Sequence, residues 1–137
     1  GNSVLDIYAV PGHTPGSIGL LVREKRLFLA SDGTNAGPWL FLPESQKLSV
    51  YQNSLKKIQK LDFDYLLTGH SLRPVPRERL EDFIGVAMNP DIERARKLRP
   101  NEFAPGVTPL RCFEKKNPEQ SGHGKNKASI VISRDKL

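Results

Sequence analysis

Three residues of metal-ligating type follow short apolar runs in this sequence. His13 lies in PGHTPGS, Asp32 lies in LFLASDG, and His70 lies in LLTGH. Neutral imidazole and carboxylate are common ligands of zinc and of non-haem iron. Glycine and proline beside a ligand let the backbone approach closely and hold the side chain in one orientation. Each residue alone is also typical of an ordinary turn, so the prediction of a metal or proton-transfer site depends on all three occurring together.

The three residues each follow a predicted β-strand. Residues 3–10 and 17–23 are rich in β-forming side chains, and PGHTPG forms the loop between them. Residues 27–30 are a fully apolar run that ends just before Asp32, which predicts a strand buried on both faces. Residues 64–67 form a similar run before His70. Active sites of mixed α/β folds commonly collect at strand ends, so this order favours a shared site.

Helices are predicted between and after these strands. Apolar residues at helical spacing predict a helix over 48–61, with Ser45 as its N-cap. A second helix is predicted over 77–87, and Asn89 is expected to cap a short helix that begins at Pro90. The alternation of elements predicts an α/β (α+β) fold, a mixed sheet with flanking helices.

The C-terminal part of the chain predicts two further strands, over 110–114 and 128–133. The polar segment 115–127 between them is predicted to be mobile, and its His123 to be a solvated loop residue. Cys112, the single cysteine, is predicted to be a buried small apolar residue, and one cysteine cannot form an internal disulfide. We therefore expect a reducing, cytoplasmic location.

Composition narrows the classes of partner. The net charge is +6 over 137 residues, and residues 71–137 carry the greater part of the excess. Charges of both signs alternate there without a long basic run or interleaved aromatic residues, so a solvated basic surface is favoured over a nucleic-acid site. No apolar run is long enough to cross a bilayer, which predicts no membrane partner.

The motifs PGHTPGSIGLL, LFLASDG and LLTGHSLRP, in this order, resemble the last three metal-binding motifs of the metallo-β-lactamase superfamily. The resemblance covers about residues 4–76. It implies an αββα sandwich with a site for two metal ions, usually zinc. By resemblance, His13 is a ligand of the first metal, Asp32 bridges both metals, and His70 is a ligand of the second. In having an aspartate at the bridging position, the sequence resembles the glyoxalase II-like and general hydrolase branch of that superfamily.

The first motif of that family, His-x-His-x-Asp-His, has no counterpart here, because the three histidines of the chain are never two residues apart. The resemblance therefore implies a single partial domain over 1–137, the C-terminal half of the sandwich. Residues 4–76 hold the motifs, and residues 77–137 hold helices and the last strands. No residue replaces the aspartate that orients the nucleophile in the family, so no catalytic residue is assigned, and zinc is expected to bind weakly or not at all.

Three functions remain open at this point. The chain is interpreted as half of a metal-dependent hydrolase of a small-molecule substrate, inactive alone or completed by a partner. The alternatives are a non-catalytic binding or oligomerising module and a nucleic-acid-processing member of the same superfamily. Half a sandwich leaves a sheet face open, so a homo-oligomer or a complementary N-terminal half is expected. Trp39 is a candidate for the wall of a substrate pocket or for the core. Ser71 is not expected to be a nucleophile, because the sequence shows no base and no oxyanion hole for it.

Overall fold

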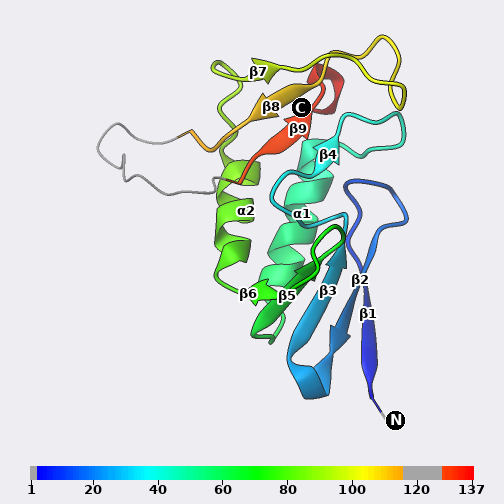
Figure 1. Cartoon of the computed structure of the whole chain (residues 1–137), viewed down its shortest axis with the longest axis vertical. Coiled ribbons are helices and arrows are strands. Elements are labelled where there is room, and N and C mark those ends of the chain that lie inside the picture. The colour runs from blue at the N-terminus through cyan, green and yellow to red at the C-terminus, as the bar shows by residue number, and fades with distance from the viewer. Residues whose placement is uncertain (1–2, 116–127) are drawn as a thin grey trace.

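The structure, a computed structural model, describes residues 3–115 and 128–137 (Figure 1). This part of the chain forms two β-sheets, two α-helices and two short 3₁₀ helices, Arg23–Lys25 and Arg134–Lys136. The first sheet has five strands in the order β1-β2-β3-β5-β6. Its strands are β1 (Leu5–Ala9), β2 (Ile18–Val22), β3 (Leu27–Ser31), β5 (Tyr65–Thr68) and β6 (Val75–Pro76). This sheet contains all the strands predicted before His70 and confirms the mixed sheet with flanking helices.

The pairing within the first sheet sets the direction of its strands. β1 pairs antiparallel with β2, and β2 pairs antiparallel with β3. β3 then pairs parallel with β5 through a crossover that contains the first helix. As a result β1, β3 and β5 all run in the same direction, and their C-terminal ends lie at one edge of the sheet.

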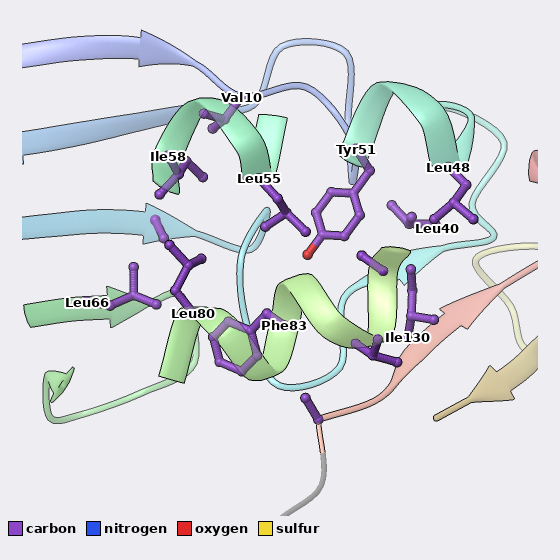
Figure 2. Packing of buried hydrophobic residues seen from close by; sticks show 14 of the residues in the cluster. Val10, Leu40, Leu48, Tyr51, Leu55, Ile58, Leu66, Leu80, Phe83 and Ile130 are labelled. Carbon is purple, nitrogen blue, oxygen red and sulfur yellow. The ribbon is translucent and has the colours of Figure 1, made fainter. Parts of the chain in front are cut away.

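Helices α1 (Leu48–Gln59) and α2 (Arg79–Met88) cover one face of this sheet. Figure 2 shows Leu55 and Ile58 of α1 and Leu80 of α2 lying against the strands, near Val10 and Leu66. These side chains are almost completely buried. Burying a Leu, Ile or Val side chain contributes about 1.5–3 kcal/mol, so this helix-covered face holds the main core.

The opposite face of the same sheet is apolar and has no covering layer among the described residues. The strand register brings ten apolar side chains to this open face. Ile7 is 68% exposed, and Leu5, Ile18 and Tyr65 are each about half exposed. The remaining members of the open face are Ala9, which is exposed, the half-buried Leu20, Leu27, Leu29 and Leu67, and Val22, which is buried by its neighbours.

The run 27–30 was predicted to be buried on both faces, and this prediction is wrong. Phe28 and Ala30 are fully buried under the helices, whereas Leu27 and Leu29 are only half-buried. The reason is that Leu27 and Leu29 point to the open face. The apolar composition of the strand matches a two-sided burial that the described residues do not provide.

The second sheet has four strands in the order β4-β9-β8-β7 and lies beyond the C-terminal ends of β1, β3 and β5 (Figure 1). Its strands are β4 (Trp39–Leu40), β7 (Arg96–Lys97), β8 (Leu110–Cys112) and β9 (Ile130–Ile132). Strand β9 is buried on both faces. Ile130 and Ile132 join the main core, and Val131 packs in a smaller cluster with Phe41 and Ala104. Two-sided burial in the second sheet is confined to β9, because both residues of β7 and Trp39 of β4 are exposed.

Two predicted helix starts are wrong. Ser45 does not cap α1, because its hydroxyl instead donates to the carbonyl of His13 at 2.9 Å, and the helix begins after Lys47 without a side-chain cap. No helix begins at Pro90, which forms an isolated β-bridge with Glu114. This bridge holds Pro90 beside the residues that follow β8, and the chain then turns at residues 92–94 instead of forming a helix.

The prediction for Cys112 is confirmed: the side chain is buried, and burial raises the pKa of its thiol to about 11. The predictions for segment 115–127 and His123 fall, apart from residue 115, outside the described residues. Within the described residues, neither helix has the length and apolar content needed to cross a membrane.

Tyr51 on α1 provides a first test of this packing. Its ring is buried, its hydroxyl has no hydrogen-bond partner among the described residues, and burial raises its pKa. An unpaired buried hydroxyl costs about 1–3 kcal/mol. We expect Tyr51→Phe to raise the free energy of unfolding by about 1 kcal/mol in urea denaturation, and Tyr51→Leu, which removes the ring, to lower it. A destabilised Tyr51→Phe protein would mean that the hydroxyl is paired.

Candidate metal centre

The three candidate ligands lie at one edge of the first sheet. Asp32 directly follows β3, His70 follows β5 by two residues, and His13 follows β1 by four. Because these strands run in the same direction, their C-terminal loops converge. All three residues line one cavity of about 770 Å³. The order of the motifs along the chain therefore predicted a real spatial cluster of loops.

Asp32 is directed toward His70 by an irregularity at the end of β3. The register between β3 and β5 shifts between Leu29 and Ser31, and Ser31 has a φ of 47°. A positive φ is uncommon for a residue other than glycine, and such conformations cluster at functional sites. The carbonyl of Ser31 accepts a hydrogen bond from the Gly69 amide at 2.8 Å, which fixes the two strand ends together.

Asp32 and His70 form a close pair. Nε2 of His70 lies 3.1 Å from Oδ1 of Asp32. No aligned hydrogen bond joins these two atoms, and Oδ1 is buried without a hydrogen-bond partner among the described residues. A buried carboxylate oxygen without a partner is costly, and a cation bound to it would offset that cost. The His70 side chain is 87% exposed, so it is open to a further partner.

Gly69 is required for this approach. A Cβ built on Gly69 would lie 2.0 Å from Oδ1 of Asp32 and 3.1 Å from the carbonyl carbon of Ser31. Any other residue would therefore push the carboxylate away from His70. The glycine in LLTGH has a steric role at the site.

The loop that holds His13 is fixed to helix α1. The ring of Tyr51 packs so closely under Gly12 that a Cβ there would lie 2.6 Å from Cδ2 of the ring. The Ser54 hydroxyl donates to the carbonyl of Pro11 at 2.7 Å, and the backbone amide of Gln46 donates to the carbonyl of Gly12 at 2.8 Å. These contacts hold the PGHTPGS loop in one conformation.

The imidazole of His13 bonds to the backbone carbonyl of Trp39, with Nδ1 2.8 Å from the oxygen. A carbonyl oxygen only accepts, so Nδ1 carries the hydrogen, and in the neutral ring Nε2 keeps a lone pair. This is the arrangement in which a histidine is prepared to bind a metal through Nε2, because the other nitrogen fixes the tautomer and the orientation of the ring.

The donor set of two imidazoles and one carboxylate fits zinc in type. Within residues 3–115 and 128–137, however, no three His, Cys, Asp or Glu side chains gather closely enough to hold one ion. The geometry instead provides an Asp32–His70 pair and a separately oriented His13 on the wall of the same cavity. The three residues are of metal-ligating types but do not form a complete ligand set among the described residues, and the prediction of zinc at this site stays a prediction.

Other cavity residues were predicted in part. Trp39 was predicted to lie either on the wall of a substrate pocket or in the core, and it lies on the cavity wall. Ser71 also lies on the wall, but its hydroxyl donates to the carbonyl of Arg73 at 2.8 Å, which is a turn contact. Sequence reasoning missed Phe103 and Phe83. The signal for Phe103 was an aromatic residue in a polar, Pro- and Gly-containing segment, PNEFAPG, where no core position was expected.

Comparison with solved structures finds the same arrangement of elements in larger proteins. A metallo-β-lactamase superfamily protein from Sulfolobus tokodaii matches 74% of this chain with a TM-score of 0.54 and 18% identity. A metallo-β-lactamase family protein from Thermus thermophilus matches 61% with a TM-score of 0.52 and 23% identity. ETHE1 from Myxococcus xanthus matches 65% with a TM-score of 0.52 and 21% identity. The chain has part of the metallo-β-lactamase fold.

The metallo-β-lactamase fold is matched only in part, because this chain spans 38%, 32% and 42% of those three proteins, respectively. No family model matches the sequence, and the comparison with curated proteins also finds no match. The likeness therefore concerns the fold, and the predictions for the individual site residues stay predictions.

The steric role of Gly69 gives a second test. We expect Gly69→Ala to lower the free energy of unfolding by about 1 kcal/mol, because the methyl group must displace the Asp32 carboxylate or the strand end. Gly16→Ala is the matched control, since a Cβ at Gly16 meets nothing within 4 Å. Equal urea midpoints for Gly69→Ala and wild type would show that the strand end tolerates the methyl group.

Proposed function

We propose that this chain is the C-terminal half of a metal-dependent hydrolase of the metallo-β-lactamase superfamily. In this proposal His13, Asp32 and His70 act as metal ligands. The single observation that supports it best is the buried Oδ1 of Asp32, which lies beside His70 without an aligned hydrogen bond. A structural ion pair would be expected to satisfy both partners, whereas a metal-ligating pair keeps lone pairs directed toward a cation.

Each of the three residues would have a separate role in binding the metal. His13 would bind through Nε2, with its ring held by the Trp39 carbonyl. Asp32 would offer its unpaired oxygen, and His70 its Nε2, from strand ends that are tied together by the Ser31–Gly69 hydrogen bond. A bound zinc ion would supply a water of lowered pKa for hydrolysis. The chain's own contribution is the orientation of these ligands and the cavity in which a substrate lies.

The complementary half of the fold is part of the proposal. The open face consists of ten apolar side chains, from Leu5 on β1 to Leu67 on β5, without a charged residue among them. An apolar face of this size typically marks an interaction surface, because covering it removes apolar side chains from water. We propose that the cover is a second β-sheet from the N-terminal half of the fold. The solved structures that resemble this chain are more than twice the length of the part matched.

A complementary half would also complete the ligand set. The described residues offer one close pair and one separate histidine, and a zinc site needs at least three protein ligands. A sheet that covers the open face would end beside the edge from which His13, Asp32 and His70 emerge. The same partner would therefore bury the apolar face and bring the missing histidines and aspartate to the metals.

Metal binding by the purified chain tests the ligand assignment. We expect native mass spectrometry and chelator competition to show weak zinc binding that falls at least about tenfold in His13→Ala and in His70→Ala, because each removes a ligand. His123→Ala is the matched control, because His123 lies outside the three motifs. Zinc binding that is equal in all four proteins, or absent at millimolar zinc, would contradict the assignment and favour a non-catalytic module.

The coding sequence upstream of Gly1 tests the complementary half. We expect either the coding sequence upstream of the Gly1 codon or a neighbouring gene to encode the motif His-x-His-x-Asp-His. We expect the completed protein to bind two zinc ions and to hydrolyse esters or thioesters. Absence of such a motif would contradict the proposal.

The oligomeric state of the chain alone provides the counter-test. A stable dimer that is dissociated by Ile7→Glu, but not by Leu72→Glu, would mean that a second copy covers the open face instead. Leu72 is the matched control because it is fully exposed and lies outside the open face.

A further inference from the structure

The cavity beside the candidate ligands has an aromatic wall that the metal ligands do not explain. Trp39 and Phe103 both line it, from segments that are 64 residues apart in sequence, with ring centroids 6.2 Å apart and ring planes inclined by 52°. Trp39 is 38% exposed and Phe103 is 60% exposed. Two large aromatic side chains left in contact with water at a cavity mouth are typical of a binding surface.

The aromatic wall is held in place from behind. The Trp39 ring packs at 5.1 Å on the ring of Phe41, which is buried. On the other side, Asn101 accepts a hydrogen bond from the backbone amide of Phe103 at 3.1 Å, and the neighbouring Ala104 is buried in the small second cluster. Because the two side chains are already held in place, they lose little conformational entropy when a ligand binds, which favours binding.

The aromatic wall is also fixed relative to the candidate ligands. The carbonyl of Trp39 bonds to the ring of His13 at 2.8 Å. The Asn35 side chain donates to the carbonyl of Asp32 at 3.2 Å and accepts from the amide of Gly37 at 2.7 Å, so the loop from Asp32 to the wall is braced internally. A group bound between the rings would therefore lie at a set position with respect to Asp32 and His70.

We propose that Trp39 and Phe103 bind the aromatic or bulky apolar part of a small-molecule substrate, and so set the specificity of this site. The inference rests on the proposed hydrolase function, because it assumes that the bond to be cleaved lies over Asp32 and His70. The cavity volume of about 770 Å³ is in the range typical of small-molecule sites. The aromatic wall favours a ring-containing ester, thioester or amide over a polyanionic nucleic acid, which would need a basic groove.

Trp39 is the single tryptophan of the chain, so its emission reports on the aromatic wall alone. The probes are two neutral amides, 4-phenylbutyramide and butyramide, titrated against the wild-type chain with excitation at 295 nm. We expect a saturable change in emission, with a dissociation constant at least about tenfold lower for the phenyl compound. Equal binding of the two amides, or no saturable change, would overturn the inference.

The matched variants are Phe103→Ala and Phe113→Ala. Phe113 is a comparably exposed phenylalanine, at 42%, that does not line the cavity. We expect Phe103→Ala to reduce the preference for the phenyl compound by about five- to tenfold and Phe113→Ala to leave it within twofold. Equal losses in the two variants, or a loss in Ile7→Ser on the open face, would place the binding elsewhere and contradict the proposal.

Each titration is repeated with a chelator and with added zinc, which separates this inference from the proposed function. Zinc binding that depends on His13 and His70, together with no preference for the phenyl compound, would contradict the proposed role of the aromatic wall and leave the proposed metal ligands standing. A preference for the phenyl compound that depends on Phe103, together with no zinc binding at millimolar zinc, would support the aromatic wall and contradict the assignment of His13, Asp32 and His70 as metal ligands.

Discussion

The parallel pairing of β3 with β5 is the constraint on which the site depends. It places Asp32 and His70 at neighbouring strand ends, and the Gly69 amide bonded to the Ser31 carbonyl joins these ends at 2.8 Å. The positive φ of Ser31 and the absence of a side chain at Gly69 then let the carboxylate reach the imidazole. Helix α1 lies in the crossover between the two strands and also supports the loop of His13. The crossover therefore positions Asp32 and His70 directly and supports the loop of His13, which itself follows β1.

The strands around the site were predictable from local composition, because alternating or continuous apolar runs bounded by Gly, Pro and charged turns are a strong signal. The order of the motifs predicted which loops converge. Burial was less predictable. The apolar run at 27–30 has the composition of a strand covered on both sides, yet Leu27 and Leu29 reach the open face. Composition reports the environment a strand requires, and the described residues supply only one side of it.

The remaining differences between the predicted and the observed structure arise from tertiary contacts that the local sequence does not reveal. Ser45 is a good N-cap by type, but the His13 carbonyl, 32 residues earlier in the chain, takes its hydroxyl. Pro90 suits the first turn of a helix, but it forms a β-bridge with Glu114 instead, and only a turn follows it. Phe103 joins Trp39 only because the loop between the paired strands β7 and β8 brings it to the cavity wall. The aromatic wall therefore required the structure.

The hydrogen bond between His13 and Trp39 has a thermodynamic consequence. One imidazole ring joins the edge that holds the candidate ligands to the wall that holds the aromatic rings. A cation on Nε2 withdraws electron density from the ring and makes the Nδ1 hydrogen a stronger donor to the Trp39 carbonyl. Any ligand that shifts this carbonyl changes the orientation of the ring in turn. If both proposed ligands bind and this contact couples them, linkage requires that each alters the affinity of the other by the same factor.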